Sequence, residues 1–237
     1  MNTSHRKEFC LEIWKKKTGF TLAEVLVTLG IIGVVAALTL PSLMANYQKR
    51  NAEAHLKHFY SLMRQGIEMT ANDQGADCEI KQEYVHASNG FHTWWENCLG
   101  RELKTMDKKK FGSNIDEMVV LADGSAFTAY MPNTATVHFF YCTSPEKCAP
   151  ERFDGRTSFL FTLIYTENNG MQFYTGSGDY GNSTRESLLA NCRSGLAHEE
   201  SDGGTISRRH TCAALIQRDG WKIAPDYPWQ YSAREKK

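Results

Sequence analysis

The residue with the clearest chemical potential is Glu24, a carboxylate at the start of a long apolar stretch. An ionised carboxylate in such a segment is costly and needs a partner. One interpretation is that its side chain snorkels to a nearby aqueous interface, where the N-terminus of a helix also favours negative charge. The other is that it pairs with a cation of another chain, because a buried ion pair specifies register more than it adds stability.

Other residues offer little chemistry. His55 and His58 are one helical turn apart, but no carboxylate or cysteine stands at ligand spacing, which favours a solvated helix face over a metal site. The lysine run at 108–110 is typical of a solvated loop. The sequence contains no G-x-S-x-G, H-E-x-x-H, P-loop or dinucleotide-binding pattern. We therefore predict no enzymatic activity and no metal site.

Glu24 lies at the junction of two very different segments. Residues 1–19 carry five basic and two acidic side chains, whereas no charged residue occurs from Val25 to Gln48. This uncharged stretch is long enough to cross a hydrocarbon core of about 30 Å as a helix. The lysines before it place the N-terminus in the cytoplasm. A secretory signal peptide would have a shorter apolar region followed by a small-residue cleavage site, and a plain membrane anchor is a further alternative.

The junction itself favours a third interpretation. Residues 15–24 read Lys-Lys-Lys-Thr-Gly-Phe-Thr-Leu-Ala-Glu, and an apolar run with Pro41 follows. This pattern resembles the type III signal of type IV pilins and type II secretion pseudopilins. The resemblance implies that a membrane-embedded prepilin peptidase cuts between Gly19 and Phe20, and that Phe20 becomes the N-methylated first residue. Gly19 has no side chain, so a protease can approach its backbone closely.

The resemblance also assigns roles within the apolar helix. Glu24 of one subunit would neutralise the Phe20 amine of another and set the register of subunits in a filament. Pro41 cannot donate a backbone hydrogen bond, so we expect a kink or local melting of the helix near residues 39–41. Calcium is a weaker expectation, because some major pseudopilins hold it in a C-terminal loop. Its candidate ligands here are Glu167, Asn168, Asn169, Asp179 and Asn182, for which an exposed turn cluster is the favoured interpretation.

The cysteine count fits removal of the leader. Cys10 would be cut off, which leaves six cysteines in a head outside the cytoplasm, an even number that suits a disulfide framework. Unpaired core cysteines and a zinc site are the alternatives, and the lack of a C-x-x-C pair disfavours zinc. Six cysteines allow 15 connectivities. Sequence proximity favours Cys78–Cys98, Cys142–Cys148 and Cys192–Cys212.

The fold class predicted is α+β, with a long N-terminal helix, its first half transmembrane, packed on an antiparallel sheet as in pilins. Apolar residues from Ala52 to Ile67 recur every three or four positions, which indicates one helix from about Thr21 to Asn72. Residues 73–115 are expected to be an irregular connection with one short helix. The expected head elements are strands at 118–122, 126–131, 136–142, 158–166 and 171–175, and helices at 92–103, 185–192 and 209–217.

These expectations define five segments. They are a cleaved leader (1–19), a transmembrane and assembly helix (20–48), its amphipathic continuation (49–72), a globular head (73–231) and a flexible tail (232–237). The 27 basic and 27 acidic residues balance, and loss of the leader leaves a net charge of −3, which argues against a DNA-gripping surface. Four tryptophans, Trp94, Trp95, Trp221 and Trp229, are typical of a core, although surface adhesion is an alternative.

We therefore predict a structural, non-enzymatic subunit of a type IV pilus or a type II secretion filament. Its partners would be other pilins, prepilin peptidase, an inner-membrane assembly platform and membrane lipid, with no nucleic acid. It would span the cytoplasmic membrane once and later join a periplasmic or surface filament. One alternative is a membrane-anchored extracytoplasmic binding domain. Another is a DNA-uptake pilin, which would need a basic patch formed by Arg185, Arg193, Arg208, Arg209 and His210.

Overall fold

The computed structural model describes residues 19–73, 77–87, 89–103, 107–111, 115–148, 153–193 and 208–229. The chain divides into two compact units, residues 1–45 and 46–237, which are described separately. The longest element, helix α1 (Leu22–Thr70), begins in the first unit and ends in the second. It agrees with the predicted helix to within two residues at each end.

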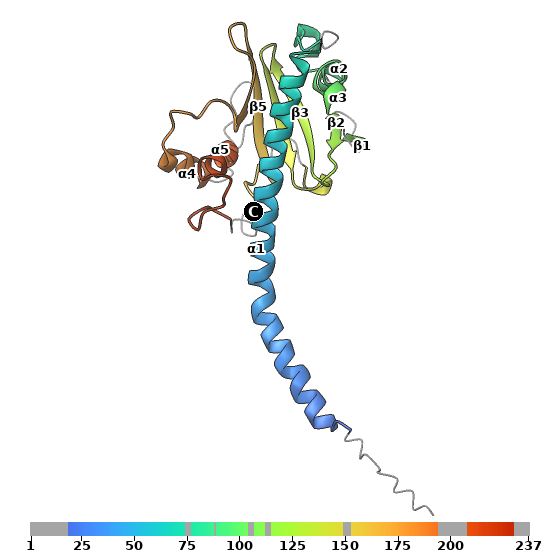
Figure 1. The fold of residues 1–237 in the computed structure, drawn as a ribbon, viewed down its shortest axis with the longest axis vertical. Helices are drawn as coiled ribbons and strands as arrows, with labels where there is room; N and C mark the ends of the chain where they lie inside the picture. The colour runs from blue at the N-terminus through green and yellow to red at the C-terminus, as the bar shows by residue number, and fades with distance from the viewer. Residues whose placement is uncertain are drawn as a thin grey trace, which may run out of the picture. The chain divides into compact units, whose positions relative to one another are not determined.

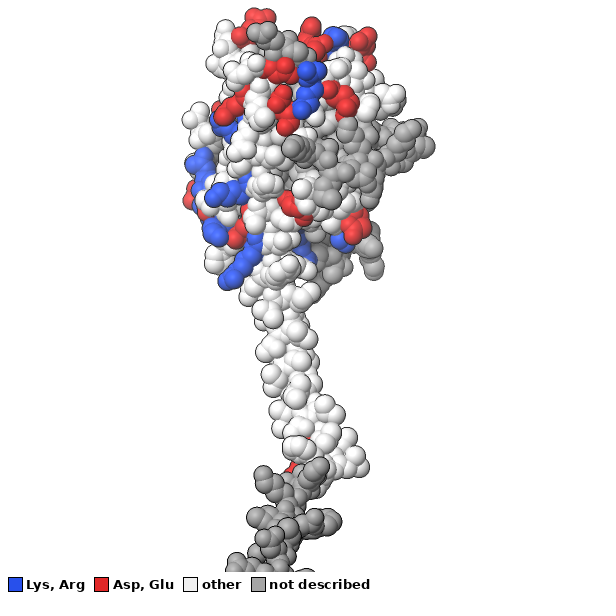
Figure 2. All heavy atoms as spheres, turned by 45° about the vertical axis from the view of Figure 1, so that its right-hand side comes forward, with Lys and Arg blue, Asp and Glu red and all other residues white. Residues whose placement is uncertain are grey.

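The described part of the first unit is an apolar helix. Its large apolar side chains are exposed along its whole length; the exposed fraction is 78% for Leu22 near the start and 64% for Leu43 near the end. A window of this helix is long and apolar enough to cross a membrane. Apart from an acidic side chain at its start, Figure 2 shows this stretch as uncharged. The helix runs unbroken through Pro41, so the expected local melting is absent. The Thr39 hydroxyl donates to the Val35 carbonyl and the Ser42 hydroxyl to the Thr39 carbonyl, which adds local hydrogen bonds beside the proline.

In the second unit, α1 buries one stripe of side chains. Ala52, Leu56, Phe59 and Met63 are fully buried, as the spacing predicts. Beyond Met63 the stripe continues through Gly66 and Thr70, whereas Ile67 is only half-buried. A Cβ at Gly66 would lie 3.0 Å from the side chain of Leu103, so Gly66 allows close packing and a larger residue there would force Leu103 to shift.

The second unit contains a six-stranded antiparallel sheet in which each strand pairs with the next along the chain. The strands are β1 (Asp107–Phe111), β2 (Ile115–Val120), β3 (Ala126–Asn133), β4 (Thr136–Cys142), β5 (Ser158–Thr166) and β6 (Gly170–Thr175). This confirms the α+β, pilin-like fold class. The expected loop at 108–110 is wrong, because these lysines lie in β1, and residues 73–115 are therefore not wholly irregular.

Phe59 is at the centre of the packing between helix and sheet. Its ring stacks on Tyr141 with centroids 4.5 Å apart and meets Phe161 edge-on at 4.9 Å. The ring centroids of Phe127 and Phe173 lie 5.4 and 5.9 Å from that of Phe59. These four rings come from β3, β4, β5 and β6, so one helical residue joins four strands. Aromatic pairs of this kind add about 0.5–1.5 kcal/mol each beyond the area they bury.

Short helices flank the sheet on two sides (Figure 1). Helices α2 (Gly90–Asn97) and α3 (Leu99–Glu102) replace the single helix expected at 92–103, and α2 contacts β2 and β3. Helices α4 (Arg185–Arg193) and α5 (Cys212–Arg218) lie on the other side, where α5 contacts β5 and β6. Three short 3-10 helices, η1 (Gln82–Tyr84), η2 (Pro145–Lys147) and η3 (Arg208–Thr211), complete the described elements.

Three disulfides join elements that are close in sequence. Cys78–Cys98 ties the segment after α1 to the end of α2, Cys142–Cys148 closes a short loop after β4, and Cys192–Cys212 joins α4 to α5. These are the three pairs that sequence proximity favours. Cys10 lies outside the described residues.

The C-terminal segment, residues 219–229, forms hydrogen bonds to both α5 and α1. After α5, the Trp221 N–H donates to the Ile216 carbonyl and the Gly220 N–H to the Gln217 carbonyl, which is a Schellman cap with Gly220 at φ 72°. The chain then passes α1, where the Glu53 carboxylate accepts hydrogen bonds from the Ile223 N–H at 2.8 Å and the Lys222 ammonium at 3.1 Å. Trp229 is buried further along, so this segment belongs to the core.

Candidate processing and assembly site

Gly19 and Phe20 precede α1 and belong to neither helix nor strand. Both are exposed, Phe20 at 88%, and no described residue beyond their chain neighbours comes within 4 Å of the position a Gly19 side chain would occupy. The described part of the chain therefore leaves the peptide bond between them uncovered. The lysines at 15–17 lie outside the described residues.

Thr21 and Glu24 together form a capping box at the start of α1. The Glu24 carboxylate accepts hydrogen bonds from the Thr21 backbone N–H and hydroxyl, both at 2.8 Å, and the Thr21 hydroxyl accepts the Glu24 N–H at 3.2 Å. Such reciprocal bonds satisfy backbone donors that a helix leaves unpaired at its first turn. The sequence analysis missed Thr21. The pattern T-x-x-E before an apolar run was the signal that could have found it.

The capping box also leaves capacity for a second partner. All the described hydrogen bonds to the carboxylate reach one oxygen, Oε2, whereas Oε1 accepts none from a described residue. An ionised carboxylate accepts about four hydrogen bonds. The carboxylate is held back toward the chain before the helix, next to Phe20. It can therefore cap its own helix and accept a hydrogen bond from an amine of another chain.

The helix, the sheet and this N-terminal arrangement define a type IV pilin-like protein. The family model described as "Prokaryotic N-terminal methylation motif" matches residues 14–40, which include Gly19, Phe20 and Glu24. A second model, "Family of unknown function (DUF6613)", matches residues 42–231, and the chain belongs to this family. Neither the curated proteins nor the solved structures gave a match.

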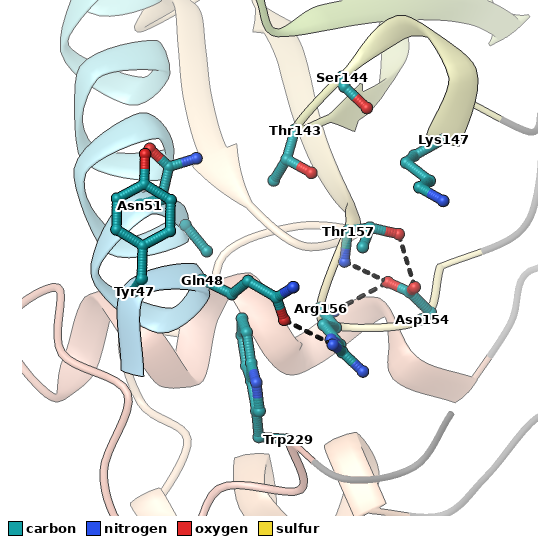
Figure 3. Close-up of a pocket in the computed structure, with 11 residues that line it drawn as sticks. Tyr47, Gln48, Asn51, Thr143, Ser144, Lys147, Asp154, Arg156, Thr157 and Trp229 are labelled. Carbon is teal, nitrogen blue, oxygen red and sulfur yellow. Dashed lines mark hydrogen bonds between the residues drawn. The ribbon is translucent and has the colours of Figure 1, made fainter. Parts of the chain in front are cut away.

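The second unit contains a pocket of about 480 Å³ beside the first residues of its part of α1 (Figure 3). We call it the polar pocket, because most of its lining residues are polar. It is lined by residues from α1, from the segments after β4 and before β5, and from the C-terminal segment. The lining residues are Tyr47, Gln48, Asn51, Ala52, Thr143, Ser144, Lys147, Asp154, Arg156, Thr157 and Trp229. Sequence reasoning did not find this pocket, because its walls are brought together only by the tertiary fold.

Two charged residues of the pocket are already engaged. The Asp154 carboxylate accepts the N–H groups of Arg156, Thr157 and Ser158 at 2.6–2.9 Å. The Arg156 guanidinium donates to the Gln48 Oε1 at 2.6 Å and lies 5.6 Å from the centre of the Trp229 ring. These contacts order the loop before β5 against α1. They leave the exposed Lys147 as the side chain best able to meet a charged partner there.

Three of the five residues that a DNA-uptake patch would need are engaged by other parts of the second unit. Arg185 is engaged by Asp219 at 2.7 Å and Asp226 at 2.8 Å, and this guanidinium lowers the pKa of Asp226 to about 2. The Arg193 guanidinium donates to the Asp226 carbonyl at 2.7 Å. Arg209 is only 2% exposed and donates to the Asp154 carbonyl. Three of the candidate cations therefore hold the head together and present no shared basic surface.

The structure also separates the candidate calcium ligands. Glu167, Asn168 and Asn169 lie in the β5–β6 turn, whereas Asp179 and Asn182 follow the other end of β6. The six residues of β6, about 20 Å of extended strand, separate the two groups. The described residues contain no cluster of three or more His, Cys, Asp or Glu side chains able to hold a metal, and His55 with His58 does not extend into one.

Proposed function

We propose that this protein is a non-enzymatic subunit of a pilus or secretion filament, processed by prepilin peptidase between Gly19 and Phe20. Residues 1–19 would be removed, and the helix from Phe20 would anchor the subunit in the membrane before assembly. The head would then lie outside the cytoplasm, where its three disulfides are stable. The filament would be assembled by machinery that this chain does not contain.

The observation that carries this proposal is the position of Glu24 within the matched methylation motif. A simple anchor gains only the helix cap from this carboxylate, and an apolar residue there would be cheaper to insert. A filament subunit gains a site for the positive amine that cleavage creates on Phe20 of a neighbour. Among the described residues, only Oε2 of Glu24 accepts hydrogen bonds, which leaves Oε1 for that contact.

The membrane-anchored binding domain is a second candidate, and the polar pocket beside Lys147 and Arg156 is the observation that favours it. The DNA-uptake alternative loses support, because Arg185, Arg193 and Arg209 are engaged inside the head. Glu24 distinguishes the first two candidates, since an anchor tolerates its replacement and a filament subunit does not.

The test is a comparison of filament yield for the wild type, Glu24→Leu and Thr28→Leu, expressed in the native cell. Thr28 is one turn further along the same exposed helix, so Thr28→Leu is a matched control for added apolarity. We expect all three proteins in the membrane, and Glu24→Leu alone to lose filaments. Wild-type filament yield from Glu24→Leu would show that assembly does not depend on Glu24, whereas a processed wild type that forms no filaments would favour the anchored binding domain.

A further inference from the structure

The far end of the head's helix carries a concentration of carboxylates. From residue 68 to residue 103 the chain has seven acidic and two basic residues. We call this set the acidic cap. It consists of Glu68, Asp73, Asp77, Glu79, Glu83, Glu96 and Glu102. Arg101 and Lys81 neutralise two of them, at 2.9 Å to Asp73 and 3.0 Å to Asp77. Figure 2 shows the red acidic side chains crowded at this end of the unit.

Glu79 and Glu83 are the most available members of the cap. Both are exposed, and neither forms an ion pair within the described part of the chain. They lie next to the Cys78–Cys98 disulfide, which fixes the backbone on which they stand. The cap is therefore an ordered negative surface.

The exposed face of the same helix carries the opposite charge nearer its start. Arg50, Lys57 and Arg64 are seven residues apart and all exposed. Seven residues return to nearly the same side of a helix, with a drift of about 20°. We call these three residues the basic stripe. The one acidic residue between positions 46 and 67, Glu53, points its carboxylate to Lys222 and the Ile223 N–H, away from the stripe.

The two surfaces are displaced along one axis. Lys57, the middle of the stripe, precedes Glu68 by 11 residues and Asp73 by 16, which is roughly 17–24 Å along a helix. Within one head, Arg64 interacts with Glu68 one turn further along the helix. Arg50 and Lys57 lie at least 11 residues before the first residue of the cap on the same helix, which is too far to pair with it. A second copy with a parallel helix, shifted by about 20 Å, would bring its cap beside the stripe of the first.

We propose that the acidic cap of one subunit docks against the basic stripe of another copy of this chain. This inference rests on the proposed function, because parallel helices with an axial shift are what a filament supplies. A contact between two different surfaces of the same protein generates an open helical polymer when its rotation does not close into a ring. Complementary charges give such a contact its partner choice and its register.

The test uses full-length protein in the native cell, with sheared filaments measured by pelleting. The cap variant is Glu79→Lys with Glu83→Lys, and the stripe variant is Arg50→Glu with Lys57→Glu. The control variant is Glu167→Lys with Glu186→Lys, two exposed carboxylates outside both surfaces. Membrane level, N-terminal processing and the oxidised state of the head are measured for each variant to exclude misfolding.

We expect the cap and stripe variants each to lower filament yield about tenfold and the control to leave it unchanged. Combining the cap and stripe variants should restore most of the yield, because the charges are then complementary again. Wild-type filaments should also dissociate more readily at about 1 M than at about 0.1 M salt.

Two results would overturn the inference and leave the proposed function intact. One is normal filament yield from both single-surface variants. The other is failure of the combined variant to recover, which would show that the two surfaces meet other partners. Absence of filaments from processed wild-type protein would instead contradict the proposed function, and the inference with it.

Discussion

The Glu24 carboxylate lies 2.8 Å from both the backbone nitrogen and the hydroxyl of Thr21. Glu24, which is expected to set the register between subunits, thus also caps the start of its own helix. These two roles use different properties of the side chain. Capping needs an acceptor oxygen, which an amide also provides, whereas pairing with an amine of a neighbour needs the negative charge.

Glu24→Gln separates the two roles. The amide oxygen can still accept the Thr21 N–H, so we expect unchanged membrane insertion and cleavage, but filament yield lowered at least about tenfold because the charge is lost. Thr21→Val is the matched control, since it keeps the charge and removes one hydroxyl, at a cost to the helix start of about 1 kcal/mol. Equal losses in the two variants would mean that capping, and not charge, is what assembly requires.

Phe59→Ala should strongly destabilise the head. The ring contacts four aromatic side chains and is fully buried, so its removal leaves a cavity between α1 and the sheet. We expect a loss of about 3–5 kcal/mol in the free energy of unfolding, measured by denaturant titration of the full chain in detergent. Ser61→Ala, on the exposed side of the same helix, should change it by less than about 0.5 kcal/mol. A similar small change for Phe59→Ala would show that the helix does not pack as described.

The three disulfides should differ in how much each adds to the free energy of unfolding of the head. Cys78–Cys98 and Cys192–Cys212 each span 20 residues, whereas Cys142–Cys148 spans six. Loop-closure entropy then gives about 3 kcal/mol for each long loop and about 2 kcal/mol for the short one. Paired Cys→Ser variants, compared by thermal unfolding, test this order. If loss of Cys142–Cys148 proved the most damaging, the entropic account would be wrong for this head.

Stability should fall between pH 6.5 and pH 4 through His138. This side chain is half-buried on β4, opposite Tyr130 and Thr162, and burial lowers its pKa to about 4. The unfolded chain takes up a proton near pH 6.5 and the folded head does not, so folding becomes less favourable as the pH falls through this interval. The loss is at most about 3 kcal/mol.

His138→Gln should flatten the pH dependence in that interval. The amide does not titrate, so unfolding free energies at pH 7 and pH 4.5 should differ less than in the wild type. His58→Gln is the control, because His58 is exposed on α1. An unchanged pH profile in His138→Gln would mean that another group causes the loss of stability. The Asp226–Arg185 pair is not that group, because it would lower the free energy of unfolding only below about pH 4.

Much of the head was predictable because its strands are strongly patterned. The predicted bounds of β4 and β5 coincide with the observed Thr136–Cys142 and Ser158–Thr166, since apolar and β-branched residues dominate both strands. The buried stripe of α1 followed from its spacing up to Met63. Strand β1 was missed because three consecutive lysines gave no apolar alternation, and its pairing with β2 depends on the partner strand.

The site was predictable only where it is local. Gly19, Phe20 and Glu24 lie within a stretch of six residues, and one family pattern covers them. The pocket that includes Gln48, Arg156 and Trp229 joins segments more than 70 residues apart, so no sequence spacing reveals it. Whether the basic patch needed by the DNA-uptake alternative forms could not be judged from sequence for a related reason, because the carboxylates that engage Arg185 are more than 30 residues away in the chain.

The most direct test of the central claim is the intact mass and N-terminal sequence of the protein from its native membrane fraction, with and without reductant. The account predicts a mature chain that begins at N-methylated Phe20 and gains six hydrogens on reduction, one pair for each disulfide. A chain that still begins at Met1 would make this an ordinary anchored protein. A chain cut beyond Leu40 would have lost the assembly helix, and would contradict the filament account outright.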